Sequence, residues 1–258
     1  MNPILNALIF IFGLILGSFL NVVIYRLPRH ESIVYPSSHC PYCSAHIKPY
    51  DNIPLLSYAI LGGKCRSCGK HISLRYPFVE LLAGLSGVAI YLKYGLGIDW
   101  VFLFVLSLSL ITIIFIDLDN RIIPNVITYP GIVIGFASSF FMTINTVTGS
   151  VLGSVIGGGV LYATAYLYKA ITKQEGMGMG DVKLMAMLGA FLGWQASLFI
   201  IITSAFAGSI FGIALMLLAG KNRKYAIPYG PFISMGAFIY LFYGQYIIQI
   251  YLRFIGYD

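Results

Sequence analysis

Residues 122–168 read IIPNVITYPGIVIGFASSFFMTINTVTGSVLGSVIGGGVLYATAYLY, and none of these 47 residues is Asp, Glu, Lys or Arg. A helix crosses a hydrocarbon layer of about 30 Å with about 20 residues, at about 1.5 Å per residue. A charge-free run of more than twice that length predicts two crossings joined by a turn. The polar and small residues at 145–149 mark the expected turn. This stretch is typical of a polytopic membrane protein.

Other apolar stretches predict further crossings. They lie at residues 1–25, 78–92, 100–116, 184–220 and 225–252. The stretch 184–220 is again too long for one crossing, and a turn expected near 193–195 makes the crossing before it short or re-entrant. Together the stretches predict a bundle of about eight transmembrane helices. Residues 1–25 are expected to remain as the first helix, because they lack the basic start and the cleavage motif of a signal peptide.

The composition of the 258-residue chain excludes the main alternatives. Hydrophobic residues make up 59% of it and charged residues 10%, with a mean hydropathy of +0.86. A soluble globular domain has about 25% charged residues, and a disordered chain is far less apolar. Backbone amides in hydrocarbon must pair within helices or closed barrels, and barrel strands alternate apolar and polar residues. The sequence does not alternate in this way, so the predicted fold class is all-α.

The basic residues indicate how the bundle is oriented. Fourteen of the 16 Lys and Arg residues fall in the segments 26–77, 117–125, 169–183 and 220–230. These segments share the cytosolic side of the membrane if the N-terminus lies outside, and the positive-inside rule favours that orientation. The net charge of +7 is therefore read as a topology signal, and we expect no nucleic-acid partner.

The longest polar segment contains all four cysteines of the chain. Their spacing is Cys40-x2-Cys43, then 21 residues, then Cys65-x2-Cys68. Paired C-x-x-C knuckles predict a tetrahedral structural zinc site, and four thiolates complete the coordination without a histidine. Two disulfides or four free thiols are the alternatives, and a cytosolic location argues against disulfides. The predicted organisation is a first transmembrane helix at 1–25, a cytosolic zinc-binding loop at 26–77 and a helical bundle at 78–258.

Two of the nine acidic residues stand at the edges of apolar stretches. Asp117 follows 100–116 directly, and Asp181 ends the glycine-rich segment GMGMGD at 176–181 and opens the next apolar stretch. Two predicted crossings separate these acids, so both lie on one face of the membrane, together with the cysteine loop. A carboxylate at the edge of a membrane bundle is costly and indicates a function.

Two carboxylates that converge predict a specific chemistry. A few ångströms apart, they share one proton, and their apparent pKa values belong to the pair. The ionised acid takes a proton from water while the protonated acid polarises an amide carbonyl, and the roles reverse as the amine leaves. Asp117 and Asp181 are therefore candidates for peptide hydrolysis without a metal. Asp119 either competes with Asp117 for this role or is a solvated acid at a helix end.

Other residues near these acids and in the second crossing have two interpretations each. Gly178 and Gly180 either let a peptide backbone approach Asp181 or form a flexible loop in which Asp181 caps a helix. Lys183 either lies near Asp181 and favours its ionised form or reaches the lipid headgroups, and we expect the latter. Glu80 either pairs with a neighbouring basic residue or lines a substrate or cofactor pocket.

Six segments, in one order along nearly the whole chain, resemble the motifs of the bacterial type IV prepilin peptidases. These are bifunctional leader peptidases and N-methyltransferases of the GxGD aspartic class. The segments are GSFLNVVIYRLP at 17–28, the paired knuckles, RYPFVE at 75–80, Asp117 through the IPN of 123–125, GMGDVKL at 178–184 and PYGPF at 228–232.

The resemblance implies that Asp117, eight residues before the asparagine of the IPN element, and Asp181 are the catalytic pair. It implies that the substrates are prepilins or pseudopilins, cleaved at the cytosolic face of a bacterial inner membrane. It further implies N-methylation of the new N-terminus with S-adenosylmethionine. The donor site would then be built from the cytosolic loop and helix ends, and Asn21 and Glu80 are candidates for a pocket or for methyl transfer.

Three rival functions are kept as alternatives. A peptidase that has lost methylation fits the same acids, although family members of that kind often lack the cysteine loop. An ion-coupled transporter also uses rare membrane acids, but carriers place them near the midplane between repeated halves, whereas these stand at helix ends. A scaffold that recruits a partner through its zinc loop predicts that Asp117 and Asp181 are dispensable.

Overall fold

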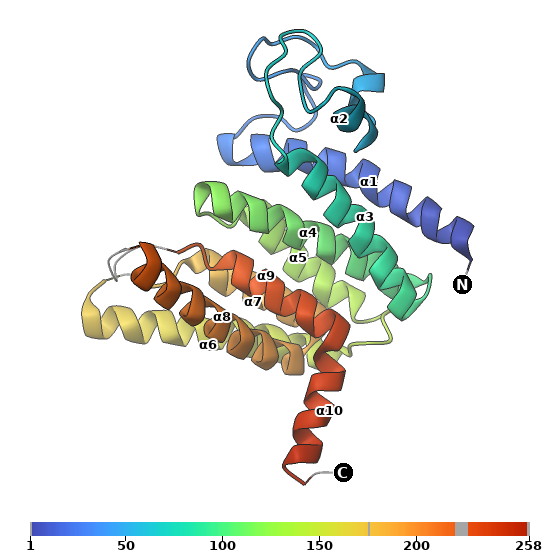
Figure 1. Ribbon diagram of the computed structural model, residues 1–258. Helices are drawn as coiled ribbons and strands as arrows, with labels where there is room; N and C mark the ends of the chain where they lie inside the picture. The colour runs from blue at the N-terminus through green and yellow to red at the C-terminus, as the bar shows by residue number, and fades with distance from the viewer. Residues whose placement is uncertain (1, 175, 220–226, 257–258) are drawn as a thin grey trace. The chain divides into compact units, whose positions relative to one another are not determined.

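The all-helical class predicted from the sequence is confirmed. The structure, a computed structural model, describes residues 2–174, 176–219 and 227–256, and the regular elements in these ranges are helices (Figure 1). Extended pairing in the same ranges is limited to two isolated bridges, His39–His46 and Lys64–His71. The chain divides into two units, Met1–Ile116 and Asp117–Asp258, which are described separately.

Five helical runs in the described ranges are long and apolar enough to cross a membrane. They are α1 (Pro3–Arg26), α4 (Ile98–Asn120), α6 (Val147–Thr172), α8 (Trp194–Ala219) and the C-terminal run Gly230–Phe254. The other predicted crossings are also helical, as α3 (Arg75–Tyr94), α5 (Asn125–Ser138) and α7 (Met179–Leu192). A multi-pass membrane protein is therefore confirmed. The number of eight crossings stays a prediction, because α5 and α7 have only 14 residues each.

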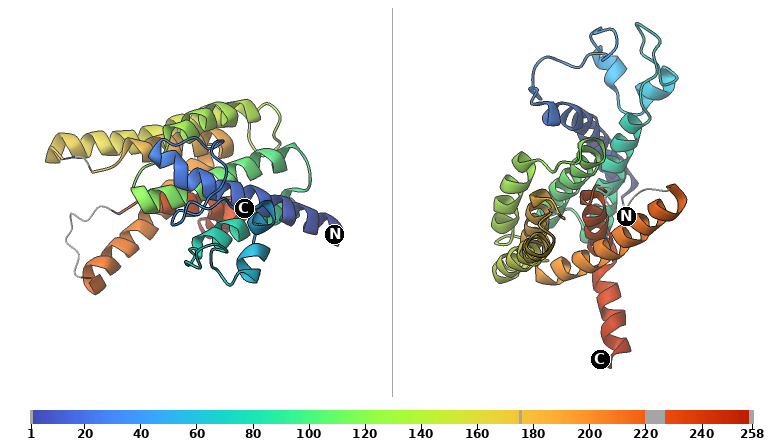
Figure 2. Two further views of the ribbon diagram at one scale, coloured as in Figure 1. Left: turned by 90° about the horizontal axis from the view of Figure 1, so that it is seen from above. Right: turned by 90° about the vertical axis from the view of Figure 1, so that its left-hand side faces the viewer.

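The first unit contains a close pair of helices, α1 and α3, which lie side by side in Figures 1 and 2. Two glycines of α1 make this approach possible. A Cβ atom added at Gly13 would lie 2.7 Å from the Cα atom of Gly84, and one added at Gly17 would lie 2.6 Å from the Cα atom of Glu80. Small residues four apart let helix backbones come together in a membrane. The start of α3 is thereby fixed against the middle of α1.

Between α1 and α3 the chain forms only short elements. They are η1 (Leu27–Arg29), η2 (Pro49–Asn52) and α2 (Leu56–Ile60). The helix α3 begins at Arg75, ahead of Pro77, because a proline in the first turn lacks only an N–H that would have no intrahelical partner. The polar segment predicted from the sequence is therefore a loop with little regular structure.

The second unit is built around α7. This helix packs against α5, α6, α8 and α9 (Gly230–Ile239), and ten of its residues are buried. A helix with neighbours on all sides is apolar all round. Against α6 the contact is backbone to backbone, because a Cβ atom at either Gly153 or Gly189 would clash with the other's carbonyl group. The hydroxyl of Ser154 then donates to the carbonyl oxygen of Ala186 at 2.9 Å.

The two turns predicted inside the long apolar stretches are both present. Helix α7 ends at Leu192 and α8 begins at Trp194, so the second turn is the single residue Gly193, whose φ of 85° suits glycine. The first turn spans 139–146 and so begins earlier than predicted. The hydroxyls of Ser138 and Ser139 donate to carbonyl oxygens of their own last turn at 2.7 Å, and such bonds compete with continuation of a helix.

Asn145, in the first of these turns, closes the C-terminal end of α7. Its Nδ2 atom donates to the carbonyl oxygens of Ala190 and Phe191 at 3.1 and 3.2 Å. The last carbonyls of a helix have no partner within the helix, so a side chain from elsewhere must satisfy them when they are buried. One polar residue thus joins the α5–α6 turn to the end of α7.

The C-terminal stretch, predicted as one helix, is helical throughout but changes direction. A π-helical segment, η3 (Tyr240–Gly244), separates α9 from α10 (Gln245–Phe254). Figure 1 shows that α10 points away from the direction of α9. Insertions of this kind bend helices because they interrupt the regular hydrogen-bond ladder.

Candidate active site and metal centre

Two acids meet inside the second unit. Asp117 lies in the last turn of α4 and Asp181 in the first turn of α7, and their exposed fractions are only 4% and 8%. The charge of Asp117 acts on Asp181, so the structure brings together two carboxyl groups that are far apart in the sequence. Asp119 is exposed. Of Asp117 and Asp119, the acid that lies near Asp181 is therefore Asp117.

The first residue of α9 holds Asp117 in place. The backbone N–H of Gly230 donates to Oδ2 of Asp117 at 2.9 Å. A Cβ atom at position 230 would lie 2.8 Å from that oxygen and 3.2 Å from Cδ1 of Ile123, so this position has no room for a side chain. The sequence analysis noted the PYGPF element and gave Gly230 no role. The available signal was a glycine directly before a proline, at the start of a helix, which predicts close backbone approach but not the partner.

The glycines of the GMGD element have different roles. Gly178 is the N-cap of α7 with extended backbone angles, and its carbonyl oxygen accepts from the N–H of Asp181 at 3.1 Å. Asp181 itself is therefore not the N-cap, and that interpretation was wrong. A Cβ atom at Gly180 would lie 2.9 Å from Cβ of Ile123, whereas one at Gly178 would make only an ordinary 3.4 Å contact with Asp181. Gly180 is required for packing, and Gly178 leaves space beside the acid.

Lys183 is tied to the start of α5. Its Nζ atom donates to Oδ1 of Asn125 at 2.8 Å and lies 5.0 Å from the centre of the Tyr129 ring. The expectation that Lys183 extends to the headgroups is therefore not met. The lysine, two residues after the GMGD element, connects the start of α7 to the last residue of the IPN element.

The cysteine loop, in the first unit, gathers its four thiols. The Sγ atoms of Cys40, Cys43, Cys65 and Cys68 all lie within 4.8 Å of one another. Cys40 and Cys68 are 3.9 Å apart, close to the spacing of about 3.8 Å that tetrahedral Zn–S bonds of about 2.3 Å require. All four cysteines are free, so the disulfide alternative is not formed. Among the described residues, the cluster includes no histidine.

The backbone of each knuckle turns in the same way. Ser44 and Gly69 both have positive φ, of 56° and 69°, directly after the second cysteine of each pair. Their N–H groups donate to the carbonyl oxygens of Cys40 and Cys65, at 2.9 Å in each case. The donor set therefore fits a structural zinc ion.

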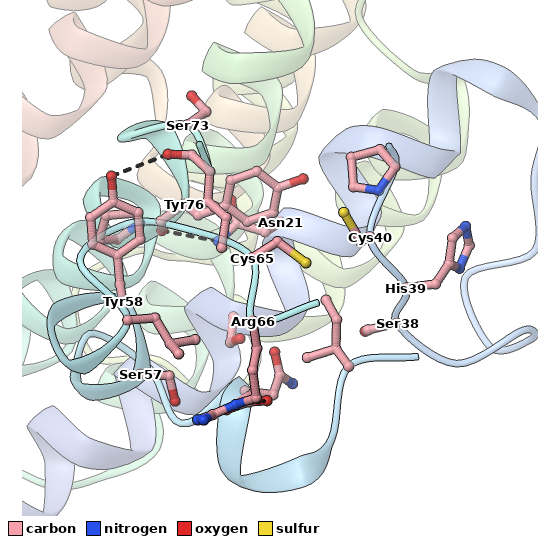
Figure 3. A pocket seen from close by; sticks show the side chains of 18 of the residues that line it. Asn21, Ser38, His39, Cys40, Ser57, Tyr58, Cys65, Arg66, Ser73 and Tyr76 are labelled. Atoms are coloured by element: carbon pink, nitrogen blue, oxygen red, sulfur yellow. Dashed lines mark hydrogen bonds and ion pairs between the residues drawn. The ribbon is translucent and has the colours of Figure 1, made fainter. Parts of the chain in front are cut away.

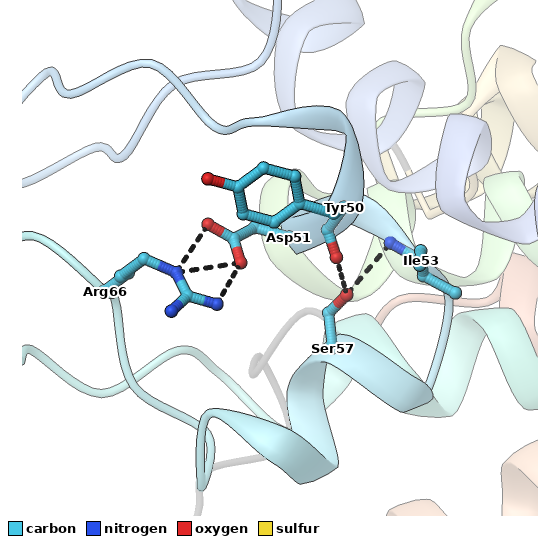
Figure 4. Close-up of polar contacts among 5 residues, drawn as sticks. All are labelled: Tyr50, Asp51, Ile53, Ser57 and Arg66. Atoms are coloured by element: carbon cyan, nitrogen blue, oxygen red, sulfur yellow. Dashed lines mark hydrogen bonds and ion pairs between the residues drawn. The ribbon is translucent and has the colours of Figure 1, made fainter.

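A polar network braces the loop beside the second knuckle (Figure 4). Arg66, next to a metal-site cysteine, donates from Nε and Nη2 to the carboxylate of Asp51 at 2.6 to 3.0 Å. This guanidinium lowers the pKa of Asp51. Ser57 accepts from the N–H of Ile53 at 3.0 Å and donates to the carbonyl oxygen of Tyr50 at 2.9 Å. Sequence reasoning missed this network, because the pairs are formed across a loop without a regular period.

The two residues proposed from the sequence for a pocket, Asn21 and Glu80, do line one cavity. It has a volume of about 370 Å³ and lies within the first unit, between the cysteine loop and the neighbouring ends of α1 and α3 (Figure 3). Glu80 is buried, and its Oε2 atom accepts from the N–H of Leu55 at 2.9 Å. Of its two interpretations, the geometry therefore favours the pocket.

Fold and site together define a multi-pass membrane protein with a buried aspartate pair in one unit and a four-cysteine centre in the other. Residues 11–94 match the bacterial peptidase A24 N-terminal domain, and residues 104–213 match the type IV leader peptidase family. The chain belongs to the type IV leader peptidase family.

Relatives over the full length carry the name prepilin leader peptidase/N-methyltransferase. The protein of Pseudomonas aeruginosa is 36% identical, over 95% of this chain and 92% of its own length. That of Aeromonas hydrophila is 36% identical over 95% of this chain and 93% of its own, and that of Stutzerimonas stutzeri 33% identical over 98% and 96%. No solved structure matches the chain.

Proposed function

We propose that this protein is an aspartic endopeptidase of the bacterial inner membrane. It removes the leader peptides of type IV prepilins or pseudopilins and methylates the new N-terminus with S-adenosylmethionine. The observation that carries the peptidase function is the burial of Asp117 and Asp181 at facing helix ends within electrostatic reach of each other. The names of the full-length relatives support both activities.

The acids act as a pair on one water molecule. One carboxyl group is ionised and takes a proton from water, and the resulting hydroxide attacks the carbonyl carbon of the scissile peptide. The protonated partner donates a hydrogen bond to the carbonyl oxygen and then gives its proton to the leaving amine. The N–H of Gly230 donates to Oδ2 of Asp117 and so helps to fix the orientation of this carboxyl group.

The substrate strand lies beside Gly178. An extended peptide needs space next to the acids, and a Cβ atom added at Gly178 would make only an ordinary 3.4 Å contact with Asp181. The space beside Gly180 is occupied by Ile123 and the space beside Gly176 by Tyr168, so the substrate does not lie against these two glycines.

The chain crosses the membrane eight times with its N-terminus outside and both acids at the cytosolic side. The concentration of 14 of the 16 basic residues in alternate connecting segments supports this orientation. Asp117 ends α4 and Asp181 begins α7, so two intervening crossings return them to one depth. A prepilin, with a basic leader followed by an apolar helix, presents its cleavage point at that depth.

The cysteine loop holds a structural zinc ion on Cys40, Cys43, Cys65 and Cys68. Four thiolates leave no open position, so the ion supplies rigidity to the loop and no reactive water. S-Adenosylmethionine supplies an electrophilic methyl group when bound.

One experiment tests both activities. Purified protein is incubated with a prepilin and S-adenosylmethionine, and the product is weighed by mass spectrometry. We expect loss of the leader and gain of one methyl group with the wild type, and no cleavage with Asp117→Asn or Asp181→Asn. The Asp119→Asn variant, at an exposed acid, is the matched control and should cleave normally. Near-normal cleavage by Asp117→Asn or Asp181→Asn would refute the mechanism. Cleavage by the wild type without methylation would show that the protein is a peptidase and not a methyltransferase.

A further inference from the structure

The first unit contains a groove along α1 that neither proposed activity uses. It is lined by α1, from Ile11 to Arg26, and by parts of the loop at 33–38 and 52–54. Its volume of about 730 Å³ falls within the usual range of about 300–1,000 Å³ for small-molecule sites. Ten of the 15 lining residues are apolar, and Arg26 is the only charged residue among them. A long apolar space with one cation indicates an amphiphilic occupant.

The helical wall of the groove is one face of α1. Its residues recur at spacings of three and four, which places them side by side along the helix, at positions 11, 14, 15, 18, 19, 22 and 26. Gly13 and Gly17, which contact α3, lie on the opposite side of the helix. The wall facing the groove is left open, and Ile15 is 55% exposed. From the loop, Val34 adds an apolar side chain that is 84% exposed.

Arg26, at the C-terminal end of α1, is a buried cation with only neutral partners among the described residues. It is 5% exposed, and its Nη1 and Nη2 atoms donate to the carbonyl oxygens of Ser32 at 2.9 Å and Ser37 at 3.4 Å. These bonds use two of the five N–H donors of a guanidinium, and Nε, which makes neither bond, is not enclosed. A buried charge is costly unless an opposite charge pairs with it. A phosphate, with its negative charge and several acceptor oxygens, fits this residue.

The apolar part of the groove has the length of one leaflet of a bilayer. Val22 follows Ile11 by 11 positions, which is about 16 Å of helix at about 1.5 Å per residue. A hydrocarbon core of about 30 Å gives each leaflet about 15 Å. Arg26 lies one helical turn beyond Val22, at the depth of the lipid headgroups. In the orientation proposed for the bundle, this end of α1 is cytosolic.

We propose that the groove holds one acyl chain of an anionic phospholipid of the cytosolic leaflet, with the lipid phosphate bound to Arg26. The apolar helix of a prepilin is the rival occupant. A helix at least about 10 Å across needs more than about 1,200 Å³ over the same length, which exceeds the volume of the groove. The basic leader that precedes that helix would also meet the like charge of Arg26. An acyl chain is thinner, and its phosphate brings the opposite charge to the right end.

The charge is tested by lipid binding to full-length protein. Lipid-free protein in detergent is titrated with phosphatidylglycerol and, separately, with phosphatidylethanolamine of the same acyl chains, and native mass spectrometry counts the bound lipids. We expect the first phosphatidylglycerol to bind about tenfold more tightly, because only this lipid has a net negative charge. Arg26→Gln should remove the preference, and Arg26→Lys should keep most of it. The matched control Arg29→Gln removes an exposed cation outside the groove and should leave the preference within twofold of the wild type.

The acyl chain is tested separately from the charge. Ile15→Trp places a large ring in the middle of the groove and should weaken binding of both lipids by about tenfold. Leu8→Trp is the matched control, because residue 8 lies two turns earlier on the same face of α1 and outside the groove. Both side chains are more than half exposed, at 55% and 58%, so both variants should fold. Zinc content and monodisperse elution check that they do.

A cross-link identifies the occupant in membranes. A photoreactive phenylalanine analogue replaces Phe19, which lines the groove, in cells that also make a prepilin. We expect an adduct with phospholipid, and an adduct with the prepilin or with a second copy of this chain overturns the proposal. Equal affinities of the wild type for the two lipids also overturn it, as do unchanged affinities in folded Arg26→Gln and Ile15→Trp.

Discussion

Replacing Gly230 with alanine should disable the peptidase without unfolding it. The added Cβ atom would lie 2.8 Å from Oδ2 of Asp117. Ordinary contact begins near 3.4 Å, so the carboxylate or the loop must move by about 0.6 Å, and the N–H bond to Asp117 lengthens with it. A displacement of about 1 Å in a reacting group costs about a hundredfold in rate, and a hydrogen bond to a charged group contributes about 1.5–3 kcal/mol. We therefore expect kcat/KM for prepilin cleavage to fall about tenfold to a hundredfold.

The assay for this variant follows cleavage of a purified prepilin in detergent under single-turnover conditions, so that product release does not mask the chemical step. Gly159→Ala is the matched control, because a Cβ atom at that position of α6 meets nothing within 4 Å. That control should cleave at the normal rate and unfold at the same temperature or slightly higher. The reasoning is refuted if Gly230→Ala, folded and with normal zinc content, cleaves within twofold of the wild type.

Four further outcomes can be checked with the same materials. Gly180→Ala should lower the free energy of unfolding more than Gly178→Ala, because its added carbon would lie 2.9 Å from Ile123 rather than 3.4 Å from Asp181; equal stabilities for the two variants would contradict the packing role. Asn145→Ala should lower the free energy of unfolding by about 1–3 kcal/mol, measured by denaturant titration, since the buried carbonyl of Phe191 loses its side-chain donor and that of Ala190 keeps only the hydroxyl of Ser150. Lys183→Met should lower it by less than about 1 kcal/mol, because its bond to Asn125 is exposed, and a larger loss would show an unrecognised role. Metal analysis of protein prepared without chelator should give one zinc ion per chain, and a folded, fully active, zinc-free preparation would exclude the structural metal.

The helical class and the second turn could be predicted because they depend on local pattern. A charge-free run of 37 residues with a glycine at position 193 can fold back at few places, and the chain does so at that residue. The gathering of the four thiols followed similarly from the spacing of Cys40, Cys43, Cys65 and Cys68. Counting the crossings between Asp117 and Asp181 predicted that both lie on one face of the membrane, and the structure adds that they are buried in one unit.

The contacts that complete the site could not be predicted because each joins distant parts of the chain. Gly230 lies 113 positions from Asp117, and nothing in the PYGPF element specifies which carboxylate its N–H will meet. The bond from Lys183 to Asn125 spans 58 positions and replaced the headgroup contact expected for an isolated lysine. Tertiary packing brings such hydrogen-bond partners together, because an unpaired buried polar group is costly. The residues next to each partner in the sequence do not specify which distant residue it will meet.

The shortness of α7 affects how water reaches the acids. Fourteen residues at about 1.5 Å each extend about 21 Å, roughly 9 Å less than a typical hydrocarbon core. α5, α6, α8 and α9 surround this helix, so protein and not lipid encloses the length that it leaves unfilled. In a bilayer of that thickness, water would reach the first turn of α7 through this depth. A longer α7 would fill the same depth and give a drier site.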